Sequence, residues 1–265
     1  MSTIQVVGAQ AYLAGLGVVH ESDECLTHLA QVHHPVYGPR VCYLKHYLED
    51  RGPKGLVNEV CGYILAESVA LPVPRNPLIL TIPTHQLAEM HRAYARKLPK
   101  VPEAAVWVTE QDRGQTLPRN LEQASDFLRR WKSLSDLIAF DTWIQNAERS
   151  ASNLLRRRNG DMVSIDHGHL AGSVRWTADL LQPDADPRHP FLGLWGNQIP
   201  ESINQGIMEA AGRHSKSYQQ AEAELKKWAV TLLDDSGDTI AILQFLKKRA
   251  DDSQDRMKRI LRLLI

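Results

Sequence analysis

Apolar residues recur at helical spacing over much of the second half of the chain. Such a stripe covers residues 121–139, and further stripes predict helices at about 201–214, 217–233 and 237–263. Nearer the N-terminus, the apolar spacing predicts a helix over 56–66 and another over 84–102, with Thr84 as its N-cap. Between Gly168 and Pro200, frequent Gly and Pro residues predict an irregular connection instead.

Short apolar runs bounded by turn residues predict strands in the N-terminal third. The runs are Ile4–Val7, Tyr12–Leu13, Val41–Lys45, Leu78–Ile82 and Ala104–Val108. Gly8, Gly15 and Gly17 predict turns, read either as plain hairpin turns or as turns whose N–H groups approach an anion. The polar segment 20–34 is interpreted as a solvated loop or helix rather than as a metal site. Strands first and helices later predict an α+β fold.

Composition sets mild limits on function. The 265 residues include 31 Lys and Arg against 31 Asp and Glu, so net charge indicates neither nucleic acid nor a membrane surface as a partner. Cys25, Cys42 and Cys61 lack CxxC spacing, which is typical of reduced thiols in a cytoplasmic protein. No signal-like segment and no run of about 18 apolar residues is present, so we expect a soluble protein.

Polar residues interrupt the apolar pattern in a regular way between Asp141 and Gly168. Two short apolar runs flank the turn Asn159–Gly160–Asp161, and such a turn predicts a hairpin that brings Asn153 and Asp166 together. An amide oxygen and a carboxylate are hard ligands suited to Mg²⁺ that carries phosphates. Glu148, just upstream, could be directed at a nucleophile. Asp141 and Asn146 are predicted to brace the loop through buried hydrogen bonds.

This stretch resembles the catalytic core of the HipA-like kinases, whose pattern is roughly D-x-W-I-x-N-x-D-R-x-x-x-N-L-L followed by I-D-H-G. The matching residues are Asp141, Trp143, Ile144, Asn146, Arg149, Asn153, Leu154, Leu155, Ile165, Asp166, His167 and Gly168. The resemblance implies a two-lobed protein-kinase-like fold, with a small β-rich N-lobe at 1–108, a hinge at 109–113 and a mainly helical C-lobe at 114–265. It implies ATP and Mg²⁺ as cofactors, Asn153 and Asp166 as metal ligands, and Glu148 at the catalytic position, where the family carries Asp.

The same resemblance extends to the N-terminal third through V-N-E at 57–59 and L-P-V-P at 71–74. It implies that Lys45 and Glu59 pair and hold the ATP phosphates, as a strand Lys and a helix Glu do in kinases. Without the resemblance, Lys45 and Glu59 are interpreted as ordinary surface charges. It also implies that main-chain groups near Val108 and Glu110 bind adenine, with ATP entering between the lobes.

Three functions remain open from the sequence. The first is transfer of the ATP γ-phosphate to a hydroxyl of a protein Ser or Thr or of a small molecule. The second is a kinase-shaped protein that binds nucleotide or a partner without catalysis. The third takes His167–Gly168–His169 as a zinc motif of a hydrolase. The basic residues of the segment 84–102 and the charged ladder Lys247–Arg256 are interpreted as solvent-facing.

Overall fold

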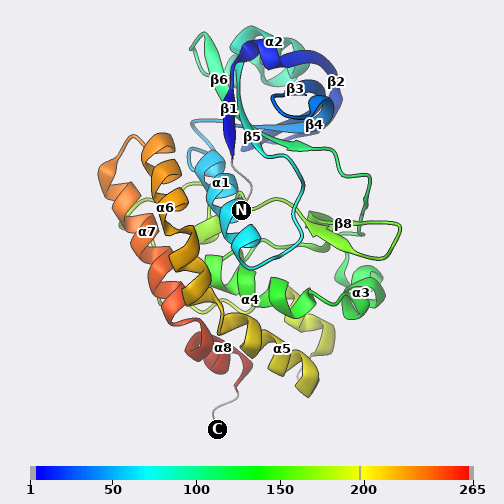
Figure 1. Ribbon diagram of the computed structural model, residues 1–265, viewed down its shortest axis with the longest axis vertical. Coiled ribbons are helices and arrows are strands. Elements are labelled where there is room, and N and C mark those ends of the chain that lie inside the picture. Colours follow the sequence, from blue (N-terminus) through cyan, green and yellow to red (C-terminus); the bar gives the residue numbers. More distant parts are fainter. Residues whose placement is uncertain (1–3, 197, 263–265) are drawn as a thin grey trace. The chain divides into compact units, whose positions relative to one another are not determined.

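Six strands form one mixed sheet in the N-terminal part of the chain (Figure 1). The computed structural model describes residues 4–196 and 198–262. The strands are β1 (Gln5–Val7), β2 (Tyr12–Glu21), β3 (Cys25–His34), β4 (Gly38–Tyr47), β5 (Leu78–Pro83) and β6 (Glu103–Glu110). Their order is β1-β5-β6-β4-β3-β2, and β1 runs parallel to β5 while the other pairs are antiparallel.

One face of this sheet carries an apolar core, because alternate residues of each strand point to the same side. Leu26, Ala30 and Val32 of β3 are fully buried, and Leu44, Leu80 and Val106 come from the neighbouring strands. The segment after β5 supplies Leu87 and Leu98 to the same core. It consists of helix α2 (Thr84–Met90) and the 3₁₀ helix η2 (Arg92–Lys97).

Three sequence-based assignments in this region are wrong. Gly15 and Gly17 lie inside β2 rather than in turns, and segment 20–34 is mostly strand β3. Every second residue of β3 is buried, as in a strand with one face towards the core. One of these buried residues is His28, which reads as polar in the sequence. The expected helix over 84–102 is broken at His91, and its N-cap is Pro83 rather than Thr84, whose hydroxyl donates to the Val101 carbonyl.

A chain of polar contacts crosses the core of this sheet. The Glu21 carboxylate lies 2.9 Å from His91 Nδ1, and His91 Nε2 lies 3.1 Å from His28 Nδ1. A carboxylate acceptor at Nδ1 requires the proton there, so the His91 Nε2 atom accepts and the His28 Nδ1–H donates. Burial, with His91 and His46 nearby, lowers the pKa of His28 to about 4. His28 is therefore neutral at pH 7.

This arrangement predicts loss of stability in mild acid. Because the pKa of His28 falls from 6.5 in the unfolded chain to about 4 in the fold, the unfolded chain binds more protons between these values. The free energy of unfolding should be fully retained above about pH 6.5 and should fall as the pH drops towards 4. Urea denaturation followed from pH 7.5 to 4 measures this slope. The variant His28→Phe should reduce this slope, whereas a change at the exposed His85, His85→Gln, should leave it unchanged.

The rest of the chain is mainly helical, with one small sheet. The helices are α1 (Gly55–Ser68), α3 (Leu121–Arg130), α4 (Leu134–Ile144), α5 (Glu201–Ala211), α6 (His214–Leu232), α7 (Ser236–Asp251) and α8 (Ser253–Leu261). The sheet has the order β7-β8-β9, with β7 at Gln115–Thr116, β8 at Leu154–Arg156 and β9 at Met162–Ser164. Short 3₁₀ turns interrupt the irregular stretch between Gly168 and Pro200.

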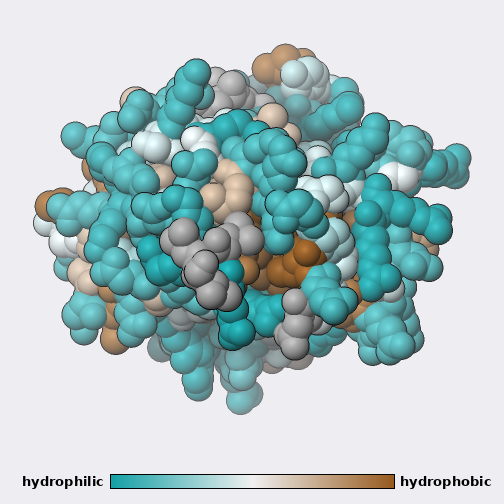
Figure 2. Space-filling model, turned by 90° about the horizontal axis from the view of Figure 1, so that it is seen from below, coloured by the Kyte–Doolittle hydropathy of each residue, from teal (hydrophilic) through white to brown (hydrophobic). Residues whose placement is uncertain are grey.

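Helix α4 is the centre of this second part, and its residues from Leu137 to Ile144 are all buried. It contacts α5, α7 and α8. The stripe predicted over 121–139 is two helices, because the chain turns at Trp131–Ser133. The last predicted helix is also two, α7 and α8, separated at Asp252; its expected end at residue 263 lies outside the described residues. Figure 2 shows that hydrophilic side chains cover most of the visible face, with a hydrophobic patch near its centre and further hydrophobic side chains towards its rim.

The chain divides into two compact units, one formed by Met1–Leu56 and Pro74–Arg113 and the other by Val57–Val73 and Gly114–Ile265. Most of α1 therefore belongs to the mainly helical unit, whereas the expected boundaries place it with the strands. Among the described helices, none is long and apolar enough to span a bilayer.

Candidate functional site

The hairpin of β8 and β9 places the predicted site residues together. Leu154 pairs with Ser164 and Arg156 with Met162, so the strand ends next to Asn153 and Asp166 meet. The Asn153 Nδ2 atom donates to Asp166 Oδ2 at 2.9 Å. Asp166 has a left-handed backbone with φ of 65°, which turns the chain out of the strand direction just after Ile165. The predicted convergence of these two residues is confirmed.

The amide of Asn153 is held on both sides. Its Oδ1 atom accepts from the Ser150 N–H and the Ser150 hydroxyl, each at 2.9 Å, while its Nδ2 faces Asp166. If the amide of Asn153 were rotated by 180°, its Nδ2 donor would face the Ser150 N–H donor. The contacts therefore decide which atom of the amide is the oxygen. The Asn153 amide oxygen and the Asp166 carboxylate are ligand types that suit Mg²⁺. This ion binds through one or two carboxylates and completes its shell with waters and phosphates. Asn153 Oδ1 would have to release Ser150 to join Asp166 on one ion.

Behind this hairpin lies a buried ion pair. Arg149 grips the Asp141 carboxylate with two hydrogen bonds, Nε to Oδ2 at 2.7 Å and Nη2 to Oδ1 at 2.9 Å, and donates through Nη1 to the Ile165 carbonyl at 2.6 Å. Asn146 Nδ2 and His189 Nε2 complete the carboxylate's partners. Burial alone would raise the pKa of Asp141, but Arg149 and His189 bring it down to about 2.

Asp141 and Asn146 therefore brace the site, as the sequence predicts. Arg149 ties the end of α4 to the residue just before Asp166. His189 was not found by sequence reasoning, because it lies 48 residues from Asp141 in an irregular stretch and has no motif around it.

Helix α1 holds the chain that follows Asp166. The Glu59 carboxylate accepts from the His167 N–H at 3.1 Å. Asn58 Nδ2 donates to the carbonyls of Gly168, Leu170 and Ser173, and its Oδ1 accepts from the Trp176 indole at 2.8 Å. Both residues are at most 2% exposed. The signal for Asn58 in the sequence is a polar residue inside an apolar helical stripe, within V-N-E at 57–59.

Close approach explains a glycine in α1. A Cβ atom at Gly62 would lie 2.4 Å from the Cβ of His167, so only glycine lets the helix lie against this residue. Burial, together with Arg149, lowers the pKa of His167 to about 4 despite the opposing effect of Glu59. His167 is thus a neutral, buried residue beneath the site.

Glu148 has the opposite character. It is exposed, two residues beyond the buried Asn146 and next to the buried Arg149. Within the described residues, its carboxylate has no hydrogen bond or ion pair. A carboxylate held by its backbone and open to solvent can meet an incoming hydroxyl, which is the position a general base requires.

The other predicted cofactor residues belong to the unit that carries the six-stranded sheet. Lys45 lies on β4, opposite Thr27 and Trp107. Val108 lies inside the sheet, paired with both Leu44 and Leu78, and the Glu110 N–H donates to the Arg75 carbonyl. Pairing of Lys45 with Glu59 and adenine binding near Val108 and Glu110 stay predictions of the resemblance.

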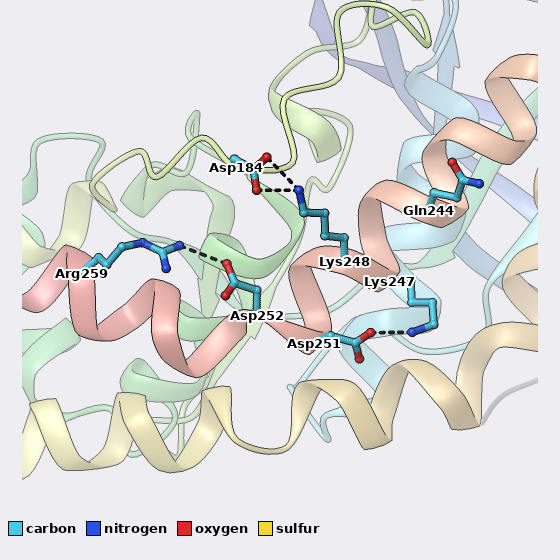
Figure 3. Close-up of a pocket in the computed structure, with 7 residues that line it drawn as sticks. All are labelled: Asp184, Gln244, Lys247, Lys248, Asp251, Asp252 and Arg259. Carbon is cyan, nitrogen blue, oxygen red and sulfur yellow. Dashed lines mark hydrogen bonds and ion pairs between the residues drawn. The ribbon is translucent and has the colours of Figure 1, made fainter.

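A polar cavity of about 870 Å³ lies elsewhere, on α7 and α8 (Figure 3). Its charges already satisfy one another, since Lys248 pairs with Asp184 at 2.7 Å and Lys247 with Asp251. A charged ligand would have to break these pairs, so we do not assign chemistry to it. Within residues 4–196 and 198–262, no three His, Cys, Asp or Glu side chains are grouped to hold a metal ion. The hydrolase interpretation of His167 and His169 gains no support.

Comparison with known proteins adds no assignment. No model of a known protein family matches this chain, and no curated protein matches its sequence.

Proposed function

We propose that this chain is a HipA-like phosphotransferase that moves the γ-phosphate of ATP to a hydroxyl acceptor. The observation that carries the proposal is the contact between Asn153 and Asp166 at the open end of the β8–β9 hairpin. Phosphoryl transfer depends mainly on positioning and on charge stabilisation, and a hairpin fixed by buried contacts provides the first of these.

Each described residue of the hairpin region has one task in this proposal. Asp166, with Asn153 beside it, would hold Mg²⁺, which when bound neutralises charge on the phosphates. Glu148 orients or deprotonates the acceptor hydroxyl. The loop that carries Glu148 is held by the contacts among Asp141, Arg149 and His189. The backbone after Asp166 is held by Glu59 and Asn58.

Two parts of the proposal rest on the resemblance alone. These are the grip of Lys45 on the ATP phosphates and the adenine contacts near Val108 and Glu110. The acceptor is a protein Ser or Thr or a small molecule. The cysteines Cys25, Cys42 and Cys61 are free thiols.

A kinase-shaped binding protein is the second candidate. The observation that favours it is the glutamate at position 148, because its extra methylene moves the carboxylate by roughly 1 Å, a misplacement that can cost about 10²-fold in rate. Both candidates bind nucleotide, so binding is tested first and transfer second.

We expect MgATP to raise the melting temperature of the wild type. A ligand bound only by the folded chain adds about 2.7 kcal/mol at 100 times its Kd, equivalent to roughly 5–11 °C for a chain of this size. The variant Asp166→Ala should lose most of the Mg²⁺-dependent part, because it removes the carboxylate ligand. Asn153→Ala should lose less, since its oxygen already serves Ser150. Differential scanning fluorimetry with ATP, Mg²⁺ and both together measures these shifts.

Asp161→Ala is the matched control, because Asp161 is a carboxylate of the same hairpin that lies in the exposed turn with Asn159. It should keep the full MgATP response. An unchanged melting curve of the wild type at millimolar MgATP would overturn both the transferase and the nucleotide-binding candidates.

A further inference from the structure

Arg249 is a charged residue that the fold buries completely. Its side chain is 0% exposed, although it stands in the run Lys247–Lys248–Arg249, which the sequence predicts to be solvent-facing. That prediction is wrong for Arg249 and for Arg256, which is also 0% exposed. Burying a guanidinium costs folding free energy unless its N–H groups are hydrogen-bonded. The partners of Arg249 therefore indicate its role in the fold.

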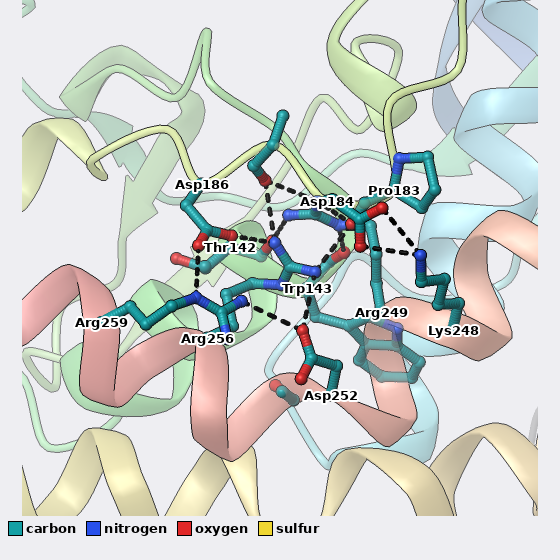
Figure 4. Close-up of polar contacts among 12 residues, drawn as sticks. Thr142, Trp143, Pro183, Asp184, Asp186, Lys248, Arg249, Asp252, Arg256 and Arg259 are labelled. Carbon is teal, nitrogen blue, oxygen red and sulfur yellow. Dashed lines mark hydrogen bonds and ion pairs between the residues drawn. The ribbon is translucent and has the colours of Figure 1, made fainter.

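The four described hydrogen bonds of Arg249 all go to main-chain carbonyls, which belong to two separate segments (Figure 4). Nε donates to Trp143 O at 2.7 Å and Nη2 to Thr142 O at 2.5 Å. Nη1 donates to Pro183 O at 3.0 Å and to Ala185 O at 2.8 Å. The planar fork of one side chain therefore joins the two segments.

The first of these segments is the end of α4. Thr142 and Trp143 belong to the last turn of the helix, where a cation is favourable, and the Thr142 carbonyl also accepts from the Gln145 N–H at 3.3 Å. The Trp143 indole also donates to the Leu246 carbonyl of α7 at 2.9 Å. Five residues beyond Trp143 stands Glu148, so this anchor sets where the site segment 145–153 begins.

The second segment, residues 183–185, is followed by residues that contact α4 again. Residues 183–186 lead to His189, whose Nε2 lies 3.2 Å from the Asp141 carboxylate in α4. Arg256 holds this segment too, through Pro183 O at 2.7 Å, Ala185 O at 2.9 Å and the Asp186 carboxylate, but none of its described hydrogen bonds goes to α4. Of Arg249 and Arg256, only Arg249 has described hydrogen bonds to both segments.

We propose that Arg249 is a positioning residue for phosphoryl transfer: it clamps the end of α4 to residues 183–185 and thereby sets the place of Glu148 and Asn153. The inference rests on the proposed function. It makes α7 part of the support of the site, about a hundred residues further along the chain than the residues it positions.

Arg249→Lys keeps the charge but cannot form the fork, so it tests the clamp. We expect kcat to fall by about 10²-fold, as for a misplacement of about 1 Å, while the KM for ATP changes little. Amide hydrogen exchange should rise in 142–153 and in 183–189 but not in α5 or α6. Arg256→Lys is the matched control, equally buried, and should raise exchange in 183–186 while leaving kcat and the exchange of 145–153 as in the wild type.

Exchange in 145–153 that stays at the wild-type level in Arg249→Lys, or that rises equally across the helical unit, would overturn the proposal. If Arg249→Lys does not fold, native-state hydrogen exchange of the wild type tests the proposal instead. Segments 145–153 and 183–189 should then open with the same free energy, and opening with different free energies would refute the clamp. Exchange needs no turnover. A wild type that transfers no phosphate therefore refutes the proposed function separately from the clamp.

Discussion

Glu148→Gln should lower phosphoryl transfer from ATP by about 10²–10⁴-fold while leaving nucleotide binding unchanged. The glutamine keeps the shape of the side chain but cannot accept a proton, and general-base catalysis contributes about this much. Because Glu148 is exposed and has no described partner, the change should not disturb the fold. Transfer of labelled phosphate from ATP, measured beside the MgATP-induced melting shift, separates catalysis from binding.

Glu148→Asp shows whether the extra methylene matters. The unperturbed pKa values of the two acids, about 4.3 and 3.9, are close, so reach rather than basicity changes. We expect activity to be kept or raised. Glu122→Gln, at an exposed carboxylate in the first turn of α3, serves as the control and should be neutral.

Two results would change the conclusion. A wild type that binds MgATP without transferring phosphate, and gains activity only as Glu148→Asp, would show that the fold has been retained for binding. Wild-type turnover that is insensitive to Glu148→Gln would remove Glu148 from the mechanism.

The largest effect on stability is expected from Arg149→Met. It leaves the Asp141 carboxylate buried with only Asn146 and His189, and breaking a buried pair from one side costs about 3–5 kcal/mol. For a chain of this size, the melting temperature should fall by roughly 6–20 °C. Chemical denaturation measures the change in free energy directly.

Arg158→Met is the control, since Arg158 is an exposed arginine in the turn of the same hairpin. Its effect should stay within about 0.5 kcal/mol. The double variant Asp141→Asn with Arg149→Met should be more stable than Arg149→Met alone, because it removes the stranded charge. If instead the two losses simply add, the pair does not interact as the structure has it.

Local patterns in the sequence were sufficient to identify the hairpin at the site. Asn159–Gly160 marks the turn, and the short apolar runs on either side of it pair as antiparallel strands, which leaves Asn153 and Asp166 as neighbours. The helices around it were also found, because a stripe at helical spacing is a local property of the chain. Their breaks at Trp131–Ser133 and Asp252 were missed, since the stripe continues across each break.

The sequence by itself thus determined which residues form the hairpin and that an amide and a carboxylate meet at its end. Only the tertiary structure decided how that end is held. Asn58, His189 and Arg249, far along the chain, bind the segments on either side of it, and a charged or polar residue in a helical stripe looks the same whether it faces water or a set of main-chain carbonyls. Burial and hydrogen bonding depend on what packs opposite, and this is set by contacts between distant segments.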